Sequence, residues 1–201
     1  MIYSKKHKFI FVHIPKTAGS SMLSFFEEKG ITINSFDEGK TFYWNHSHLT
    51  INRISNWTKI DLDLMFKFAF VRNPWDMICS RYYFSKVDNS PQSQQIRSYK
   101  TFEEFILKDT MYLRNHYISR PCDYMEIGGK NVMNFIGRYE YLNEDFEKIC
   151  NNINFSYKKL PHTNFSNRKL KDYKSEYTSE MVDVVYKLYK KEIRLFNYSF
   201  E

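Results

Sequence analysis

A short run of residues, 13–21, combines a lysine, a glycine and three hydroxyl groups directly after an apolar segment. It reads His13, Ile14, Pro15, Lys16, Thr17, Ala18, Gly19, Ser20, Ser21. Small residues let a backbone approach a phosphate closely, and a helix start offers N–H groups and the positive end of its dipole. Lys16 adds a positive charge, so the run predicts a phosphate-binding loop, although it does not fit GxxxxGK(S/T). The alternative is a plain tight turn with a surface lysine.

Arg72 follows a second apolar run, 66–71, and Ser80 lies further along the same segment. An arginine at the carboxyl end of a strand is well placed to bind a phosphate through two parallel hydrogen bonds. The alternative is that Arg72 pairs with Asp76 across the start of the following helix. Both interpretations place Arg72 at the end of a buried strand.

The elements that position these residues repeat a strand–turn–helix order. The runs 9–14 and 66–71 have the composition of strands buried on both faces of a parallel sheet, and a third strand is expected over 132–136. Helices are expected over 20–29, from Pro74 onward, over 140–152 and over 178–194. This order predicts an α/β fold, a P-loop-like three-layer sandwich with a mostly parallel central sheet flanked by helices. The less regular stretches 31–65 and 86–130 are expected over the carboxyl edge of the sheet, where ligands bind.

The loop resembles the 5′-phosphosulfate loop of sulfotransferases that use 3′-phosphoadenosine 5′-phosphosulfate (PAPS). Its PKTAG is similar to the carbohydrate-modifying, heparan sulfate 2-O-sulfotransferase-like branch, which reads PKTAG or PKTAS, rather than to the cytosolic YPKSGT. Residues 70–82, FVRNPWDMICSRY, resemble a second family block, in which the residues at Arg72 and Ser80 bind the 3′-phosphate. The family often has arginine at Met77, so one surface charge is expected to be missing. Further blocks resemble 135–142, 160–166 and 189–200, so the resemblance spans nearly the whole chain.

The resemblance implies an enzyme that transfers a sulfuryl group from PAPS to a hydroxyl, with a carbohydrate as the expected acceptor. The residues expected to bind the nucleotide are Lys16, Thr17, Ala18, Gly19, Ser20, Ser21, Arg72 and Ser80. Lys16 is also expected to neutralise charge that develops on the leaving phosphate oxygen. The transfer is expected to be in line with a loose transition state, by analogy with phosphoryl transfer.

Such a transfer needs a base for the hydroxyl proton, and histidine suits that role at neutral pH. His46 and His48 lie between the two blocks and resemble the His-x-His of uronyl 2-O-sulfotransferases, in which the second histidine is assigned the base. We therefore expect His48 to be the base and His46 its helper. The alternatives are surface histidines, or a zinc pair, for which the sequence offers no third ligand at a sensible spacing. His13 is interpreted as a strand residue, and no metal is expected in this scheme.

Two other classes of protein remain open from the sequence. A small-molecule kinase would require a Walker-type loop, which is absent, and a magnesium carboxylate, for which Asp76 is poorly placed. A non-catalytic glycan-binding module on a decayed fold is disfavoured because Lys16, Arg72, Ser80 and His48 are intact.

Length and composition set the remaining expectations. The chain has 201 residues, which favours one domain over 1–201, and its formal charge of +7 favours anionic partners. Nucleic acid is not the expected partner, and the sequence carries no signal for oligomeric state. Cys79, Cys122 and Cys150 form no CxxC pair, so neither a disulfide framework nor a zinc site is indicated. The first apolar run is too short to span a membrane, and a cytoplasmic location is expected.

Overall fold

The computed structural model describes residues 2–31, 48–58, 60–108, 120–157, 159–161 and 172–200. The chain divides into two compact units. The first comprises Met1–Val71 and Pro121–Asn164, and the second comprises Arg72–Arg120 and Phe165–Glu201. The expectation of one domain over 1–201 stays a prediction.

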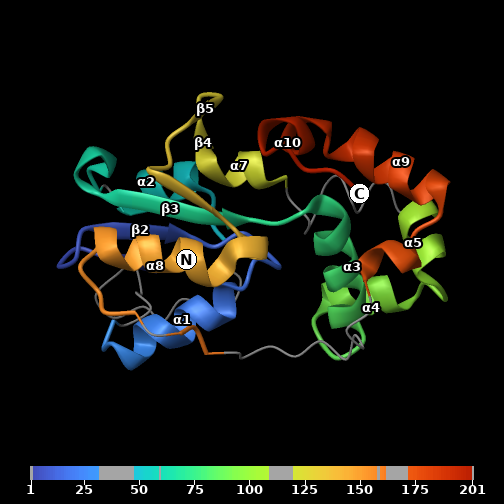
Figure 1. The fold of residues 1–201 in the computed structure, drawn as a ribbon, viewed down its shortest axis with the longest axis horizontal. Coiled ribbons are helices and arrows are strands. Elements are labelled where there is room, and N and C mark those ends of the chain that lie inside the picture. Colours follow the sequence, from blue (N-terminus) through green and yellow to red (C-terminus); the bar gives the residue numbers. More distant parts are fainter. Residues whose placement is uncertain are drawn as a thin grey trace. The chain divides into compact units, whose positions relative to one another are not determined.

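A four-stranded sheet forms the centre of the first unit (Figure 1). Its strand order is β1 (Ile2–Ser4), β2 (Phe9–Val12), β3 (Phe66–Val71) and β6 (Phe135–Arg138). β1 runs antiparallel to β2, whereas β2 with β3 and β3 with β6 are parallel pairs. The predicted mixed α/β architecture with a mostly parallel sheet flanked by helices is therefore confirmed.

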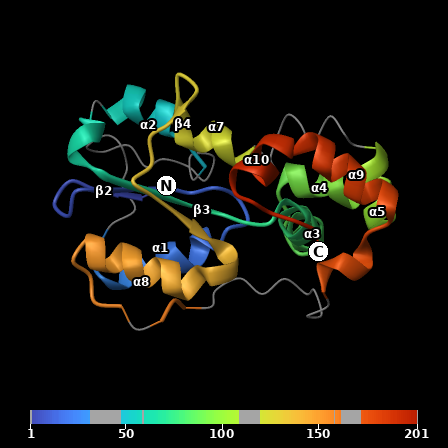
Figure 2. The same cartoon turned by 45° about the horizontal axis from the view of Figure 1, so that its top comes forward.

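The aromatic residues of β2 and β3 explain which helices cover one face of the sheet. Because side chains alternate along a strand, Phe9 and Phe11 share a face with Phe68 and Phe70. They form one hydrophobic cluster with α1 (Gly19–Glu28) and α8 (Leu142–Asn152). Figures 1 and 2 show α1 and α8 on one side of the sheet, with α2 (Ile51–Thr58) and α7 (Pro121–Met125) on the other.

The third parallel strand, β6, begins at Phe135, whereas the sequence predicted a strand over 132–136. Asn134 explains the shift. Its side-chain oxygen accepts a hydrogen bond from the Lys67 backbone N–H at 2.8 Å, and its backbone N–H donates to the Lys67 carbonyl. This side-chain bond replaces regular ladder pairing at the strand entrance. Further along, Gly137 lies opposite Phe70, and a Cβ at position 137 would lie 2.4 Å from the Phe70 ring. The strand therefore needs a glycine there.

The segment before β3 lies at the amino end of the sheet, not over the carboxyl edge as expected for all of 31–65. The 3-10 helix η2 (Leu62–Leu64) leads directly into β3. The Lys67 ammonium donates to the carbonyls of Leu62 and Met65, at 2.6 and 2.9 Å, which ties this turn to the strand entrance. Within the first unit, β4 (Glu126–Ile127) and β5 (Lys130–Asn131) form a separate hairpin, and η3 (Tyr139–Tyr141) precedes α8.

The second unit is helical. Its elements are α3 (Pro74–Ser85), α4 (Pro91–Arg97), α5 (Phe102–Lys108), η4 (Tyr173–Glu176), α9 (Ser179–Leu188) and α10 (Lys190–Leu195). Trp75 anchors its core: its indole N–H donates to the Val182 carbonyl at 3.2 Å, and its own carbonyl accepts from the Tyr177 hydroxyl at 2.8 Å. The single helix expected over 178–194 is two helices that meet at the fully buried Tyr189. No described helix in either unit is both long and apolar enough to cross a bilayer.

Candidate active site

The backbone of the loop after β2 has the geometry of an anion site. Lys16 and Ala18 both have a φ of 65°, a left-handed conformation that residues with a Cβ rarely adopt. Left-handed residues within a turn direct backbone N–H groups into a concavity that binds anions. Strained positions of this kind are concentrated at functional sites. This geometry fits a phosphate-binding loop, and the binding itself stays a prediction.

Thr17 supports this loop from inside. It is fully buried, and its hydroxyl donates a 2.8 Å hydrogen bond to the Ile14 carbonyl. Because that hydroxyl proton closes the turn, any contact of Thr17 with a phosphate would use its backbone N–H. Its role in nucleotide binding stays a prediction.

The start of α1 lacks the side chains that usually neutralise a helix start. Ala18 occupies the N-cap position and makes no side-chain cap bond, and the first turn contains no acidic residue. Helix starts otherwise favour serine, threonine, asparagine or aspartate at the cap, and acidic residues in the first turn. Lys16, Ser20 and Ser21 are all half-buried beside this start. The positive end of the helix dipole is thus available to an external anion.

His13, which follows β2 directly, packs against the first residue of α1. Its side chain is buried, with 7% of the residue exposed. A Cβ built on Gly19 would lie 1.7 Å from the His13 Nε2 atom, so position 19 must be glycine for the ring to occupy this place. The sequence interpretation of His13 as a strand residue missed this contact, although a histidine between a strand and a phosphate loop was a visible signal.

His48 joins the loop through His13. The His48 Nδ1 atom lies 3.0 Å from the His13 carbonyl oxygen, and the two ring centroids are 4.2 Å apart. Because a carbonyl oxygen only accepts hydrogen bonds, Nδ1 carries the proton, and the lone pair of the neutral His48 ring is on Nε2. The residue is exposed. The structure therefore places His48 at the carboxyl end of β2, as expected, whereas His46 lies outside the described residues.

The two histidines differ in their electrostatic surroundings. Burial lowers the pKa of His13 well below its ordinary value of 6.5, and the nearby His48 and Lys16 lower it further. His13 is therefore neutral near pH 7. A neutral neighbour does not oppose the positive charge that His48 acquires when it accepts a proton.

Arg72 and Ser80 lie in the second unit, at the start of α3 and within it. The Arg72 guanidinium pairs with Asp76, whose Oδ2 accepts from Nε at 2.8 Å and from Nη2 at 2.7 Å. The ion pair that the sequence offered as an alternative is thus present. Ser80 is buried, as is Met77, which belongs to the core of the second unit. The expectation that Met77 replaces a surface arginine is therefore wrong, because position 77 is buried.

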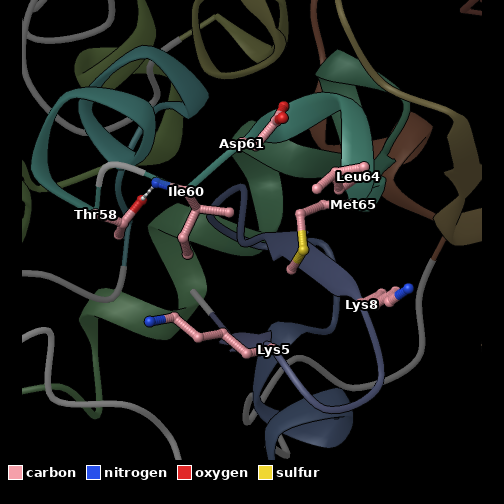
Figure 3. A pocket seen from close by; sticks show the side chains of 7 residues that line it. All are labelled: Lys5, Lys8, Thr58, Ile60, Asp61, Leu64 and Met65. Carbon is pink, nitrogen blue, oxygen red and sulfur yellow. Dashed lines mark hydrogen bonds between the residues drawn. The ribbon is translucent and has the colours of Figure 1, made fainter.

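The described residues offer few other candidate sites. No group of three or more histidine, cysteine, aspartate or glutamate side chains among them is placed to hold a metal ion. The three cysteines are buried and free of disulfides. Figure 3 shows the side chains that line a cavity beside the amino ends of β2 and β3, at the end of the sheet away from the loop. The cavity has a volume of about 240 Å³. It is lined by Lys5, Lys8, Thr58, Ile60, Asp61, Leu64 and Met65.

Comparison with known proteins gives one match. Residues 1–199 match the family model described as "Sulfotransferase family". Neither the curated proteins nor the solved structures contain a match to the chain. The family match covers the loop, His48, Arg72 and Ser80 together, and on it we conclude that this chain belongs to the sulfotransferase family.

Proposed function

We propose that this protein transfers a sulfuryl group from PAPS to a hydroxyl of a carbohydrate, with His48 as the general base. The observation that carries the proposal is the position of His48. Its Nδ1–H donates to the His13 carbonyl at the edge of the phosphate loop, which leaves Nε2 as the atom that accepts a proton. In a sulfotransferase-family chain, an imidazole next to the loop that is expected to hold the sulfuryl donor supports a role as the base.

The residues present fit the 5′ end of the nucleotide. The left-handed Lys16 and Ala18 and the uncapped start of α1 provide the geometry and the dipole that favour a phosphate. Gly19 keeps its surface open to the His13 ring, because any Cβ would occupy that space. We assign Lys16, the loop amides, Ser20 and Ser21 to the 5′-phosphosulfate.

Arg72 and Ser80 are assigned to the 3′-phosphate. The ion pair with Asp76 is compatible with this role, because a guanidinium has five N–H donors and Asp76 Oδ2 accepts from Nε and Nη2. The pair also fixes the guanidinium in one orientation. A preorganised arginine loses less conformational entropy when it binds a phosphate.

The proposed reaction couples bond formation, bond cleavage and proton transfer. The acceptor oxygen forms a bond to sulfur, and the bond between sulfur and the bridging oxygen of the 5′-phosphate breaks. His48 Nε2 takes the hydroxyl proton, and its Nδ1–H bond to the His13 carbonyl strengthens as the ring becomes positive. Lys16 neutralises the charge that develops on the leaving oxygen, and adenosine 3′,5′-bisphosphate departs. His48 then releases its proton to solvent.

A carbohydrate is the proposed acceptor for two reasons. The PKTAG sequence of the loop resembles the carbohydrate-modifying branch of the family. The formal charge of +7 also favours the acidic polysaccharides that such enzymes modify.

The test is a transfer assay with sulfate-labelled PAPS and a panel of neutral and acidic polysaccharides. We expect label in at least one polysaccharide with the wild-type protein and loss of that label with His48→Ala. A parallel melting experiment compares adenosine 3′,5′-bisphosphate with ATP and Mg²⁺, since a ligand that binds the folded state raises its melting temperature. Stabilisation by ATP alone would contradict the proposal. Stabilisation by the bisphosphate without any transfer would favour a glycan-binding module instead.

A further inference from the structure

The buried imidazole of His13 has a polar atom that packing does not explain. Its Nδ1 atom is fully buried and has no hydrogen-bond partner among the described residues. One face of the ring stacks on Phe11, with the ring centroids 5.7 Å apart and an angle of 22° between the planes. A phenylalanine would make the same stack without burying an unpartnered nitrogen. Because unsatisfied buried polar groups are rare and destabilising, the imidazole calls for a functional explanation.

The unpartnered Nδ1 also determines where the proton of the neutral ring lies. A buried N–H without an acceptor is rarer in proteins than a buried acceptor without a donor. The favoured tautomer therefore keeps the lone pair on Nδ1 and places the proton on Nε2. Nε2 is the atom that lies where a Gly19 side chain would begin, so this N–H is at the start of α1.

His13 also lies against both His48 and the loop. Its ring contacts His48, at 4.2 Å between centroids, and its Nε2 edge contacts Gly19 of the loop. If the loop holds the leaving phosphate and His48 faces the acceptor hydroxyl, the group in transfer must pass between them. The ring of His13 lies beside that path.

We propose that the Nε2–H of His13 donates a hydrogen bond to the sulfuryl group of bound PAPS and keeps this bond during transfer to the acceptor, in which His48 is the base. This inference rests on the proposed function, since it needs a sulfuryl donor bound at the loop. In this role His13 is a hydrogen-bond donor and does not accept a proton. The neutral ring supplies an N–H donor between the loop and His48.

The test compares two ligands that differ only in the sulfuryl group. Calorimetry would measure the dissociation constants of PAPS and of adenosine 3′,5′-bisphosphate for the wild type and for three variants of the full chain. His13→Phe keeps the ring stack and the carbonyl that orients His48 but removes both nitrogens. His13→Gln places an amide nitrogen near the Nε2 position, and His13→Asn places one near the Nδ1 position.

We expect His13→Phe to weaken PAPS binding by about 10- to 100-fold, the range for a hydrogen bond to a charged group, and bisphosphate binding by less than about threefold. His13→Gln should bind PAPS within about threefold of the wild type, whereas His13→Asn should resemble His13→Phe. Rescue by glutamine alone is a result that a merely structural role would not produce.

Two results would overturn the inference. Equal losses for both ligands would show that His13 only maintains the loop, and unchanged PAPS affinity in His13→Phe would show no contact with the sulfuryl group. If His13→Phe failed to fold, the comparison of glutamine with asparagine would decide, and equal values for those two would reject the inference. A wild-type protein that binds neither ligand would instead reject the proposed function itself.

Discussion

The loop at 13–21 and the segment 72–80 follow the same local pattern of buried strand, polar turn and helix. The two helix starts nevertheless differ in how their free backbone N–H groups are capped. At α3, the Asn73 side chain accepts from the Trp75 N–H at 3.1 Å, Pro74 occupies the first turn, and Asp76 adds a negative charge there. At α1, the cap is Ala18, without a side-chain bond or an acidic residue in the first turn.

This difference separates two ways of binding an anion. The start of α3 is neutralised by its own residues, so any phosphate bound there must be held by side chains such as that of Arg72. The start of α1 keeps its dipole for an external group, and two left-handed residues shape the backbone around it. We therefore expect substitutions in the first region to disturb chemistry and loop geometry, and those in the second to change ligand selectivity.

The largest expected effect is on His48, the proposed base in the first region. His48→Ala should lower the catalytic rate by about 100- to 10,000-fold, because general-base removal has effects of that size. Since His48 is not among the residues assigned to the phosphates and packs against His13 beside the loop, the dissociation constant of the bisphosphate should change by less than about threefold. Steady-state rates and calorimetry would measure the two quantities.

The matched control for this change is His7→Ala. His7 packs on Phe155 before β2 begins, at the end of the strand away from the loop, so its loss should not slow transfer. We expect His46→Ala to cost less than His48→Ala. A larger loss for His46→Ala would reverse the assignment within the pair, and full activity in both variants would place the base elsewhere.

The second region should show selectivity between ligands. Arg72→Ala should weaken adenosine 3′,5′-bisphosphate by about 30- to 1,000-fold, because it removes a charge-assisted contact, and should leave 5′-AMP nearly unaffected. Asp76→Asn separates the two roles of the arginine, since it breaks the ion pair but keeps the guanidinium. That variant should bind the bisphosphate within about threefold of the wild type. Equal losses for both nucleotides in Arg72→Ala would mean that Arg72 does not read the 3′ group.

A glycine pair tests the shape of the loop. Gly19→Ala would place a Cβ 1.7 Å from His13 Nε2, so the loop or the ring must move. Overpacking of this kind typically destabilises a folded protein by about 1–3 kcal/mol. If about 1.4 kcal/mol of this cost falls on the ligand-binding conformation of the loop, bisphosphate binding weakens roughly tenfold. Gly30→Ala is the matched control, because Gly30 has a φ of 72° and nothing within 4 Å of the new Cβ. It should destabilise by about 1–2 kcal/mol without any change in binding. Comparable binding losses in both variants would contradict the close-contact argument.

The sequence was most informative where local pattern determines structure. The apolar runs of β2 and β3 identified buried parallel strands, and the observed Arg72–Asp76 ion pair is the alternative that the sequence offered beside phosphate binding. β1 was missed because Ile2–Ser4 is too short to show a periodic pattern. The start of β6 was misplaced because the Asn134 side chain substitutes for a backbone pairing group.

The role of His13 could not be read from the sequence for a different reason. It depends on a contact with His48, 35 residues away in the chain, and on the approach of the ring to Gly19. Spacing along the chain reports neighbours within an element, whereas this cluster forms only because the fold brings His48 to the end of β2. The candidate base was found through a resemblance, but the residue that orients it required coordinates.

The smallest expected effect concerns the stability of the first region at mildly acidic pH. Burial lowers the pKa of His13 in the folded protein, whereas the unfolded chain titrates near 6.5. Between these two values the unfolded state binds a proton that the folded state does not, so the free energy of unfolding falls as the pH drops below about 6.5. The slope is at most about 1.4 kcal/mol per pH unit for one proton, and the effect disappears above about pH 7.5.

His13→Phe removes this proton, so urea unfolding at pH 7.5 and 5.5 should show the wild type losing about 1 kcal/mol more than the variant. His7→Phe, a matched change at the other end of β2, should behave like the wild type. Equal losses of unfolding free energy in the wild type and His13→Phe would mean that the His13 imidazole is not held neutral. The contrast between buried, neutral His13 and exposed His48 would then no longer stand.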